Sequence, residues 1–500
     1  MKILAAEQIR ALDKYTIEQE PVASIDLMER AAGMAFNAIS AQTMVSQVVH
    51  VFCGMGNNGG DGLAIVRMLM EAGYKHVYTY VVRHSPNASE DFKLNEARLK
   101  DISSVHYIET ELRIPKIAND AVVIDAIFGS GLTRPAEGIA AAVIRAINQS
   151  GATVYSVDIP SGLFCDLPNA AEDAVVHAHI TYTFHAPKLS FLFAANGRYI
   201  PEFRVLDIGL LKEYEAQLDS SLFYVTGTAV KALFKKREKF SHKGSYGHVL
   251  ICAGSLGKIG AAVLAVKAAL KSGAGLVSAN IPGCGYEIMQ TTNPEAMVYV
   301  DESKEVLTSA PDLEKFSVVG TGPGIGTEKE TVNYLKDLLE KSHQPMVIDA
   351  DALNIISANM HLLQLVPENS ILTPHPGEFK RLAGEWKDDL EKLQKQKEFS
   401  KNNKVVVVLK GANTSISTPE GKLHFNSTGN PGMAKGGSGD VLTGIIAALL
   451  AQKYLPEEAA VLGVYIHGLA GDFAKDTLGE TSMEASDIIH YLPKAFLSLE

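Results

Sequence analysis

Three polar turns in the first half of the sequence carry residues that can bind a ligand and move a proton. The first, Gly54–Asp61, follows the β-rich run Val48–Cys53 and reads G-M-G-N-N-G-G-D. Its glycines let the backbone fold closely around a ligand, and its amides and carboxylate supply directed acceptors and donors. The other two turns hold Asp125, before I-F-G-S-G-L, and Asp158, in D-I-P-S-G. A lone aspartate in such a turn is more often a helix cap, but three such turns together favour a site.

The second half of the sequence has a different set of polar turns, and one of them resembles an anion site. The turns are Gly254–Gly260, Thr321–Gly326, Thr373–Glu378 and Gly436–Asp440, with the motif K-G-A-N-T at Lys410–Thr414. Glycines just before a helix present free N–H groups to an anion, and Asp440 can take a proton from a hydroxyl nucleophile. The motif lacks the lysine followed by Ser or Thr of a Walker A loop. A glycine-rich helix start can serve helix packing and capping only. Taken by itself, His375 would be a structural loop histidine whose hydrogen bonds are made within the protein. Together these turns favour a site for an anionic ligand such as a nucleotide.

Short apolar runs alternate with helical segments along the chain, which predicts α/β folding in both halves. In the first half two helices around Pro21 precede strands at Val48–Cys53, His76–Val82, Ala121–Ile127 and Thr153–Val157, as in a Rossmann-like, doubly wound parallel sheet. In the second half strands are expected at His248–Ala253, Ser317–Val319, Met346–Ile348, Ser370–Leu372 and Val405–Leu409. The length of 500 residues predicts two domains, with a boundary near 213 to 225. We therefore expect domains at 1–215 and 225–500.

The composition excludes several classes of protein. A formal net charge of -11 disfavours nucleic acid and anionic membranes as partners, because both are normally bound by basic surfaces. The four cysteines form no C-x-x-C pair, so neither a zinc site nor a disulfide framework is indicated. The first residues lack the apolar core of a signal peptide, and no apolar stretch is long enough to span a bilayer. A cytoplasmic protein is expected.

The motifs of the first half resemble those of the NAD(P)H-hydrate epimerase family over about the first 210 residues. The similarity lies in G-N-N-G-G-D-G, D-A-I-F-G-S-G and D-I-P-S-G. The resemblance implies a potassium site formed by Asn58, Asp125 and Ser161, whose oxygens suit a hard cation. It also implies that the hydrate contacts Asn57, Asn58, Gly59, Gly60, Asp61, Gly129, Ser130, Gly131, Leu132, Thr133, Arg134, Pro135 and Asp158. Our hypothesis for the group that moves the proton is Asp158, because a partly buried carboxylate can act as base and acid in turn.

The motifs T-P-H-P-G-E, K-G-A-N-T and G-G-S-G-D resemble the ribokinase-like superfamily, and specifically its ADP-dependent NAD(P)H-hydrate dehydratases, over about residues 225 to 497. The resemblance implies Mg²⁺ with ADP or ATP, Asp440 as the base, and Glu378 as a residue that orients the metal through water. The implied nucleotide contacts are Lys410, Gly411, Ala412, Asn413, Thr414 and Gly439. The implied hydrate contacts are Ala261, Gly324, His375 and Asp440.

Together the two resemblances imply a bifunctional enzyme that acts on NADH hydrate and NADPH hydrate. The first half would interconvert the R and S forms, and the second would dehydrate the S form with ADP, giving AMP and phosphate. A homo-oligomer is expected. One alternative is a small-molecule kinase fused to a non-catalytic nucleotide-binding module. A dinucleotide-dependent dehydrogenase is disfavoured because Gly54–Asp61 is not a G-x-G-x-x-G sequence.

Overall fold

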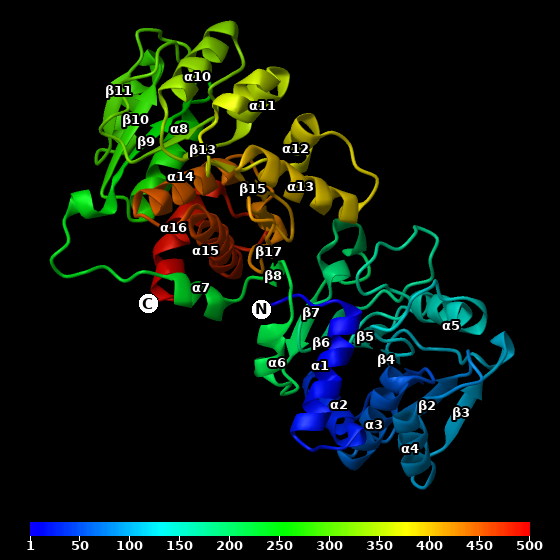
Figure 1. Cartoon of the computed structure of the whole chain (residues 1–500). Helices are drawn as coiled ribbons and strands as arrows, with labels where there is room; N and C mark the ends of the chain where they lie inside the picture. Colours follow the sequence, from blue (N-terminus) through cyan, green and yellow to red (C-terminus); the bar gives the residue numbers. More distant parts are fainter. The chain divides into compact units, whose positions relative to one another are not determined.

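The computed structural model describes residues 1–500, which fold into two compact units. The N-terminal unit comprises Lys2–Ser220, and the C-terminal unit comprises Ser221–Glu500 together with Met1 (Figure 1). Each unit is built around one sheet of its own. None of the helices has both the length and the apolar character that crossing a bilayer requires.

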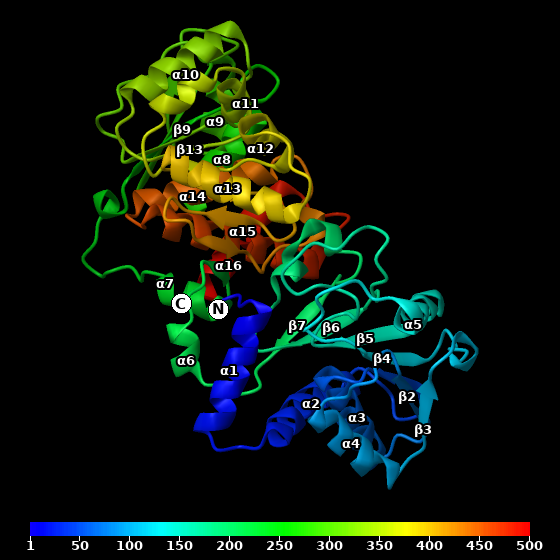
Figure 2. The same ribbon diagram turned by 45° about the vertical axis from the view of Figure 1, so that its right-hand side comes forward.

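The sheet of the N-terminal unit has seven strands in the order β3-β2-β1-β4-β5-β6-β7 (Figure 2). All neighbouring strands are parallel, which confirms the predicted doubly wound parallel sheet. The strand order reverses between β1 and β4, and such a reversal opens a crevice at the carboxyl ends of the two strands. The strands are β1 (Val49–Cys53), β2 (Val77–Val82), β3 (Val105–Ile108), β4 (Val122–Ala126), β5 (Thr153–Val157), β6 (Ile180–Phe184) and β7 (Phe203–Leu206).

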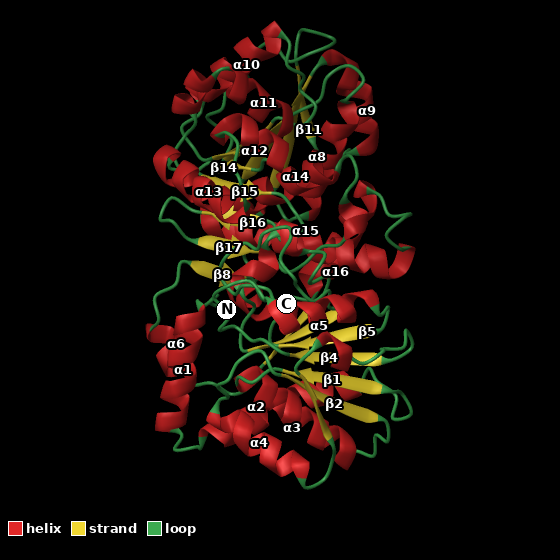
Figure 3. Cartoon of the chain, turned by 90° about the vertical axis from the view of Figure 1, so that its right-hand side faces the viewer, coloured by secondary structure: helices red, strands yellow, loops and turns green.

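Helices cover both faces of this sheet, because successive residues of a strand point to opposite faces. Val49, Val51 and Cys53 pack against α2, α3 and α4, whereas Phe52 packs with α5 on the other face. Figure 3 shows α2, α3 and α4 together beside the strands of this unit. The α-helices are α1 (Ala6–Gln19), α2 (Ser24–Ser40), α3 (Asn57–Glu71), α4 (Glu90–Lys100), α5 (Gly138–Gln149) and α6 (Lys212–Gln217).

The sheet of the C-terminal unit has ten strands in the order β11-β10-β9-β12-β13-β14-β15-β16-β17-β8. The strands from β11 to β15 are parallel, and β16 pairs antiparallel with both of its neighbours. Here the strand order reverses between β9 and β12. The strands are β8 (Leu222–Tyr224), β9 (His248–Cys252), β10 (Leu276–Ile281), β11 (Met297–Val300), β12 (Val318–Thr321), β13 (Met346–Ile348), β14 (Ile371–Leu372), β15 (Val406–Leu409), β16 (Ser415–Ser417) and β17 (Leu423–Phe425).

Ten α-helices complete the C-terminal unit and confirm its predicted α/β class. They are α7 (Gly227–Leu233), α8 (Ile259–Lys271), α9 (Tyr286–Thr292), α10 (Lys329–Lys341), α11 (Ala350–Ala358), α12 (Pro376–Ala383), α13 (Asp389–Asn403), α14 (Ser438–Ala451), α15 (Pro456–Leu478) and α16 (Ala485–Leu497). Helices α8, α14, α15 and α16 pack on one face of the sheet, and α10 to α13 pack on the other.

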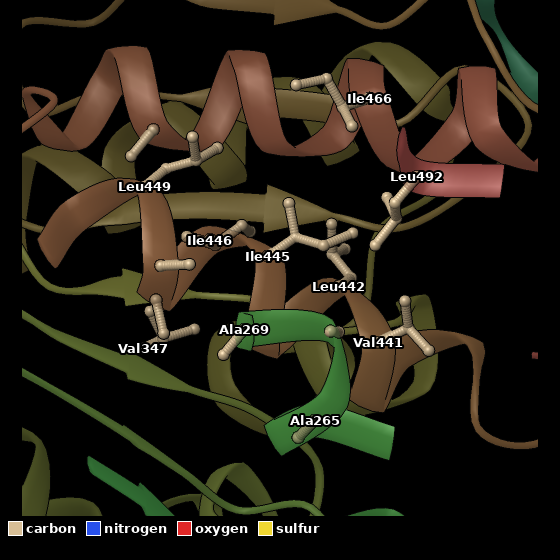
Figure 4. Packing of buried hydrophobic residues seen from close by; sticks show 14 of the residues in the cluster. Ala265, Ala269, Val347, Val441, Leu442, Ile445, Ile446, Leu449, Ile466 and Leu492 are labelled. Atoms are coloured by element: carbon tan, nitrogen blue, oxygen red, sulfur yellow. The ribbon is translucent and has the colours of Figure 1, made fainter. Parts of the chain in front are cut away.

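Helix α14 is the centre of the core of the C-terminal unit. All of its residues from Val441 to Ala451 are buried. Figure 4 shows its apolar side chains between Ala265 and Ala269 of α8 and Ile466 of α15. Burial of one Leu or Ile side chain contributes about 1.5–3 kcal/mol, so the core fixes this helix firmly. The N-terminus of α14, which carries the Gly436–Asp440 motif, is therefore held by a rigid element.

One expectation about the N-terminal motif is corrected by the structure. The sequence suggested that Gly54–Asp61 is a turn throughout, but α3 already begins at Asn57. The helix can begin early because Gly59 has no side chain, since a Cβ there would overlap the carbonyl oxygen of Gly54. Residues Asn57–Asp61 thus lie in the first turns of a helix, where backbone N–H groups are free to bind an anion.

We predict that Gly444→Ala destabilises the C-terminal unit by about 1–3 kcal/mol or more, because overpacking a core forces neighbouring atoms apart. A Cβ at Gly444 would lie 2.9 Å from Cβ of Ala268 and would overlap the carbonyl oxygen of Ala265. The matched control is Gly260→Ala in α8, where no atom lies within 4 Å of the added Cβ. Thermal unfolding should show a lower Tm for Gly444→Ala only. Equal Tm values for both variants would contradict this packing.

Candidate active sites

The N-terminal candidate site lies at the reversal of strand order between β1 and β4. Gly54 follows β1 and donates its N–H to the carbonyl of Ala126 at 3.0 Å. A side chain at Gly54 would overlap the backbone of Ile127, so the two turns can meet only because this residue is glycine. The turns that hold Asn58 and Asp125 are thereby brought against each other.

Asn58, Asp125 and Ser161 meet around the backbone of Phe128. The Asn58 side-chain amide donates to the Phe128 carbonyl at 2.8 Å, and the Phe128 N–H donates to Ser161 Oγ at 2.8 Å. Ser161 Oγ donates to Asp125 Oδ1, and the Ser161 backbone N–H donates to Asp125 Oδ2 at 2.8 Å. The three residues that the sequence assigned to one cation site therefore form one connected network.

Two features of this network fit a cation with oxygen ligands. Asn58 Oδ1 is buried and accepts no hydrogen bond, although a buried polar atom normally has a partner. Asp125 is fully buried, and burial raises the pKa of its carboxyl although four hydrogen bonds from Ser161, Ser156 and Ile127 oppose the rise. A carboxylate buried without a basic partner is costly, and a cation beside it would remove that cost. Carboxylate, amide and hydroxyl oxygens are ligands that such a cation prefers.

Asp158 follows β5 and forms a buried ion pair. Its Oδ1 lies 2.8 Å from Nζ of Lys188, whose side chain is only 1% exposed. The backbone N–H of Phe184 and the hydroxyl of Thr183 also donate to Oδ1, at 3.2 and 3.4 Å. Asp158 has φ = 64°, a left-handed conformation that is uncommon outside glycine and often occurs at functional sites. The carboxylate is thus held in one orientation by contacts to a single oxygen.

Two further carboxyls share this region. Burial raises the pKa of Asp61 well above its usual value, and the charges of Asp158 and Asp13 raise it further. Burial also raises the pKa of Asp13 to about 6, with Asp158 adding to the rise and Lys188 opposing it. Asp61 was predicted from the sequence, whereas Asp13 was not. The region therefore combines an ion-paired carboxylate with two carboxyls whose pKa is raised, which is an arrangement suited to proton transfer.

The remaining predicted hydrate contacts are less constrained. The Cβ position of Gly129 lies 3.2 Å from Cβ of Asn58, so this part of the predicted loop adjoins the Asn58 network. Thr133, Arg134 and Pro135 are exposed and make no contact with that network, and their role stays a prediction. Asn57 is exposed at the first position of α3.

The C-terminal candidate site begins at the reversal of strand order between β9 and β12. The N–H of Gly254 after β9 donates to the carbonyl of Pro323 after β12 at 2.8 Å, and Ser255 Oγ donates to the carbonyl of Gly324 at 2.7 Å. The Cβ position of Gly324 lies 3.1 Å from Cβ of Ala261. The predicted hydrate contacts Ala261 and Gly324 are therefore neighbours.

Lys410, at the end of β15, reaches the N-terminus of α14. Its Nζ lies 2.8 Å from Oδ1 of Asp349, which follows β13 and is 1% exposed. The hydroxyl of Thr443 in α14 donates to the other Asp349 oxygen at 2.9 Å. A Cβ at Gly439 would lie 3.2 Å from Lys410 Nζ, so glycine lets the lysine approach the helix. A cation and free helical N–H groups together form an anion site.

Asp440 lies in the first turn of α14 beside this ion pair. Burial raises its pKa to about 6, the negative charge of Asp349 adds to the rise, and Lys410 opposes it. A carboxyl with a pKa near 6 is ionised at neutral pH yet is a stronger base than an exposed aspartate. Asp440 is therefore suited to accept a proton from a hydroxyl group.

His375 is the N-cap of α12. Its Nδ1 accepts hydrogen bonds from the N–H groups of Gly377 and Glu378, at 2.9 and 3.3 Å, and its own N–H donates to Glu378 Oε2 at 2.8 Å. The carbonyl of the preceding Pro374 accepts from the N–H of Lys410, so the capped turn lies against the Lys410 strand. Burial raises the pKa of Glu378, and Lys410 opposes that rise.

Sequence reasoning missed three residues that the geometry places in these sites. Asp349 could have been found, because it directly follows the predicted strand Met346–Ile348 and such positions line the crevice. Lys188 lies in an apolar stretch, A-P-K-L-S-F-L-F, which gives no signal of a buried ion pair. Asp13 lies in a helix whose periodicity suggested packing only.

Fold and site geometry define a two-unit α/β protein with a cluster of polar residues at the carboxyl edge of each sheet, and the comparisons identify the family. Residues 24–190 match the family model of YjeF-related protein N-terminus, and residues 249–494 match that of NAD(P)H-hydrate dehydratase. The chain is similar over its whole length to a bifunctional NAD(P)H-hydrate repair enzyme of Moorella thermoacetica, with 35% identity covering 100% of this chain and 97% of the relative. The chain belongs to the family of bifunctional NAD(P)H-hydrate repair enzymes.

Two further proteins are similar to this chain over its whole length or over part of it. The repair enzyme of Escherichia coli is 32% identical over 98% of this chain and 93% of the relative. Among solved structures, an ADP/ATP-dependent NAD(P)H-hydrate dehydratase from Bacillus subtilis, co-crystallised with ATP/Mg²⁺, is 29% identical and has a TM-score of 0.48. That match covers 56% of this chain and 99% of the Bacillus chain.

We predict that Lys188→Met destabilises the N-terminal unit by about 3–5 kcal/mol, because it leaves the Asp158 carboxylate buried without its cation. The double variant Lys188→Met/Asp158→Asn should recover most of that loss, since it removes both charges. The control is Lys93→Met, whose partner Glu90 and whose own side chain are mostly exposed, and which should cost less than about 1 kcal/mol. The free energy of unfolding of all three variants is measured by urea denaturation. A Lys188→Met loss no larger than that of the control would contradict the ion pair.

Proposed function

We propose that the two activities of this family are divided between the two units of the chain. The N-terminal unit interconverts the R and S forms of NADH hydrate and NADPH hydrate, and Asp158 moves the proton. The C-terminal unit dehydrates the S form with ADP, giving AMP and phosphate, and Asp440 is the base. The observation that carries the proposal is that each unit has an aspartate and a cation side by side at the carboxyl edge of its own sheet.

In the C-terminal unit Asp440 removes the proton from the ring hydroxyl of the hydrate, and that oxygen attacks the terminal phosphate of the nucleotide. The N–H groups at the start of α14 and Lys410 stabilise the charge on the transferred group. Phosphate is a better leaving group than hydroxide. The ring nitrogen expels it, and loss of a proton from the neighbouring carbon restores the double bond.

The nucleotide is bound along Lys410–Thr414, where the backbone turns tightly. The N–H of Gly411 donates to Thr414 Oγ1 at 3.2 Å, and that hydroxyl donates to the Gly411 carbonyl at 3.0 Å. The buried carboxylates Asp349 and Glu378 are the groups that would face Mg²⁺ held by the nucleotide, Glu378 through water. Magnesium supplies positive charge to the phosphate oxygens. ADP as the preferred donor rests on the family alone.

In the N-terminal unit potassium would be held by Asn58, Asp125 and Ser161, and it supplies positive charge close to the start of α3. The first N–H groups of that helix bind phosphate oxygens of the dinucleotide, because a helix N-terminus favours anions. Asp158 is then the carboxylate that accepts and returns the proton of the ring hydroxyl.

We predict that Asp440→Asn lowers the rate of dehydration by at least about 100-fold, because the general base is lost, while exchange of the two epimers continues. Asp158→Asn should lower the rate of epimer exchange and leave dehydration unchanged, so that repair of an epimer mixture stops once the S form is consumed. The assay follows the absorbance of regenerated NADH and, separately, the epimer ratio. A small-molecule kinase would instead accumulate a stable phosphate ester, and that product would contradict the proposal.

We also predict that potassium stabilises the N-terminal unit. A ligand that binds only the folded state at a hundredfold excess over its Kd adds about 2.7 kcal/mol, so Tm should rise with K⁺ at constant ionic strength. Asn58→Leu, which removes the buried oxygen that has no partner, should abolish the rise. Choline in place of K⁺ controls for ionic strength. A wild-type Tm that does not respond to K⁺ would contradict the cation site.

A further inference from the structure

Helix α1 lies beside the predicted hydrate loop of the N-terminal unit, although the matched family range begins only at residue 24. Leu12 in α1 packs on Ile208 and Leu210, which follow β7. Arg10 and Asp13 are three residues apart and therefore lie on the same side of the helix. Nη1 of Arg10 lies 3.8 Å from the Cβ position of Gly131, in the predicted hydrate loop. The side of α1 that carries Asp13 thus faces the site.

In the ion pair of Lys188 and Asp158, all the N–H donors of the lysine are used, whereas one oxygen of the aspartate is free. Nζ of Lys188 donates to Asp158 and to the carbonyls of Phe184 and Ala186, at 3.1 and 3.3 Å. An ammonium group has three N–H donors, so Lys188 has none left for a ligand. All contacts to the Asp158 side chain are to Oδ1. Oδ2 therefore keeps its lone pairs for a substrate, and Lys188 is a positioning residue.

Asp13 differs from Asp158 in having no ion pair and no hydrogen bond of its own. Its neighbours are Asp158 and Lys188, which act on it through their charges, and Asp61. Three carboxyls and one ammonium thus occupy this region, and the ammonium is paired with Asp158. The other two carboxyls favour protonation, because each is partly or wholly removed from water beside a negative charge.

We propose that Asp13 is a further catalytic residue of the epimerase site, which gives a proton to the ring nitrogen of the hydrate and takes it back. The inference rests on the proposed function of the N-terminal unit. Asp158 acts on the hydroxyl, and Asp13 acts on the nitrogen on the other side of the same bond. Asp61 is buried as well, and burial raises the pKa of its carboxyl well above the usual value.

Epimer exchange by opening of the ring uses two such groups. Water adds to a dihydronicotinamide at the carbon next to the ring nitrogen, so that carbon bears a hydroxyl and is bonded to nitrogen. Asp158 takes the hydroxyl proton, the electrons of the O–H bond form a C=O bond, and the C–N bond breaks. The electron pair of the broken C–N bond goes to the nitrogen, which takes a proton from Asp13. The carbonyl rotates and nitrogen adds to its other face while both protons return. No proton, electron or water is gained or lost.

The protonation behaviour of Asp13 suits this role better than that of Asp61. A general acid works best when its pKa lies close to the working pH, and the pKa of Asp13 is raised to about 6 by burial and by Asp158. Burial raises the pKa of Asp61 well above its usual value, and the charge of Asp158 raises it further. We therefore expect the epimerisation rate to fall as pH rises above about 6, where Asp13 loses its proton.

The test is Asp13→Asn in the full chain, with epimer exchange and dehydration measured separately. We expect exchange of NADH hydrate epimers to fall at least about 100-fold and dehydration of the S form to be unchanged. Asp13→Glu should restore part of the rate, and the rate loss above pH 6 should be absent in Asp13→Asn. Tm should stay equal or rise, since a raised carboxyl pKa means that ionised Asp13 destabilises the fold at neutral pH.

The matched control is Glu18→Gln, which removes an exposed carboxylate of the same helix whose partner is Lys14. It should leave both rates unchanged. If the wild type exchanges epimers and Asp13→Asn does so equally fast, the role of Asp13 is wrong and the proposed function stands. If the wild type does not exchange epimers at all, the proposed function of this unit fails as well.

Discussion

Burial of negative charge is the constraint on which both sites depend. Asp125, Asp158 and Asp349 lie at carboxyl ends of parallel strands, where the crevice needs polar groups and the surrounding core excludes water. An ionised carboxylate there is costly unless it is paired or hydrogen-bonded. Asp158 is paired with Lys188 and Asp349 with Lys410, whereas Asp125 has hydrogen bonds only. Asp125 is therefore the carboxylate beside which a bound cation would complete the site. The cost of burying an unpaired charge thus distinguishes the candidate metal position from the two ion pairs.

Close approach of backbone is the second requirement, and glycine meets it at both reversals of strand order. A side chain at Gly54 would overlap the turn after β4, and one at Gly322 would overlap the carbonyl of Asp349. Gly439 likewise leaves room for Lys410 at the N-terminus of α14. These residues explain why the glycine motifs occur directly after strands and before helices. Their role is to let two loops share one small volume, so that side chains from different strands can reach the same ligand.

Sequence patterns predicted the elements that carry these loops, and they predicted the residues that lie next to glycine motifs. The strand expected at Val48–Cys53 is β1, and Asn58, Asp125 and Ser161, the trio that the family resemblance implies, form one network. Patterns failed where a residue acts through a partner that is distant in sequence. Lys188 is separated from Asp158 by thirty positions and by strand β6, and Asp13 comes from a helix at the start of the unit. The sequence around Lys188 or Asp13 does not distinguish either residue from a structural one. The role of each depends on which strands become neighbours in the fold.

The two aspartate–lysine pairs look alike but differ in what the lysine can still do. Lys188 is 1% exposed and donates to three oxygens, so it can only fix Asp158 and keep it charged. Lys410 is 24% exposed and has one partner, Asp349, so two of its N–H groups remain for an incoming phosphate. Under the proposed function, the carboxylate is the reactive member of the first pair, and the lysine is the ligand-binding member of the second. The same kind of ion pair at the carboxyl edge of a sheet would then support proton transfer in one unit and phosphate binding in the other, and the number of free N–H donors on the lysine would decide between the two.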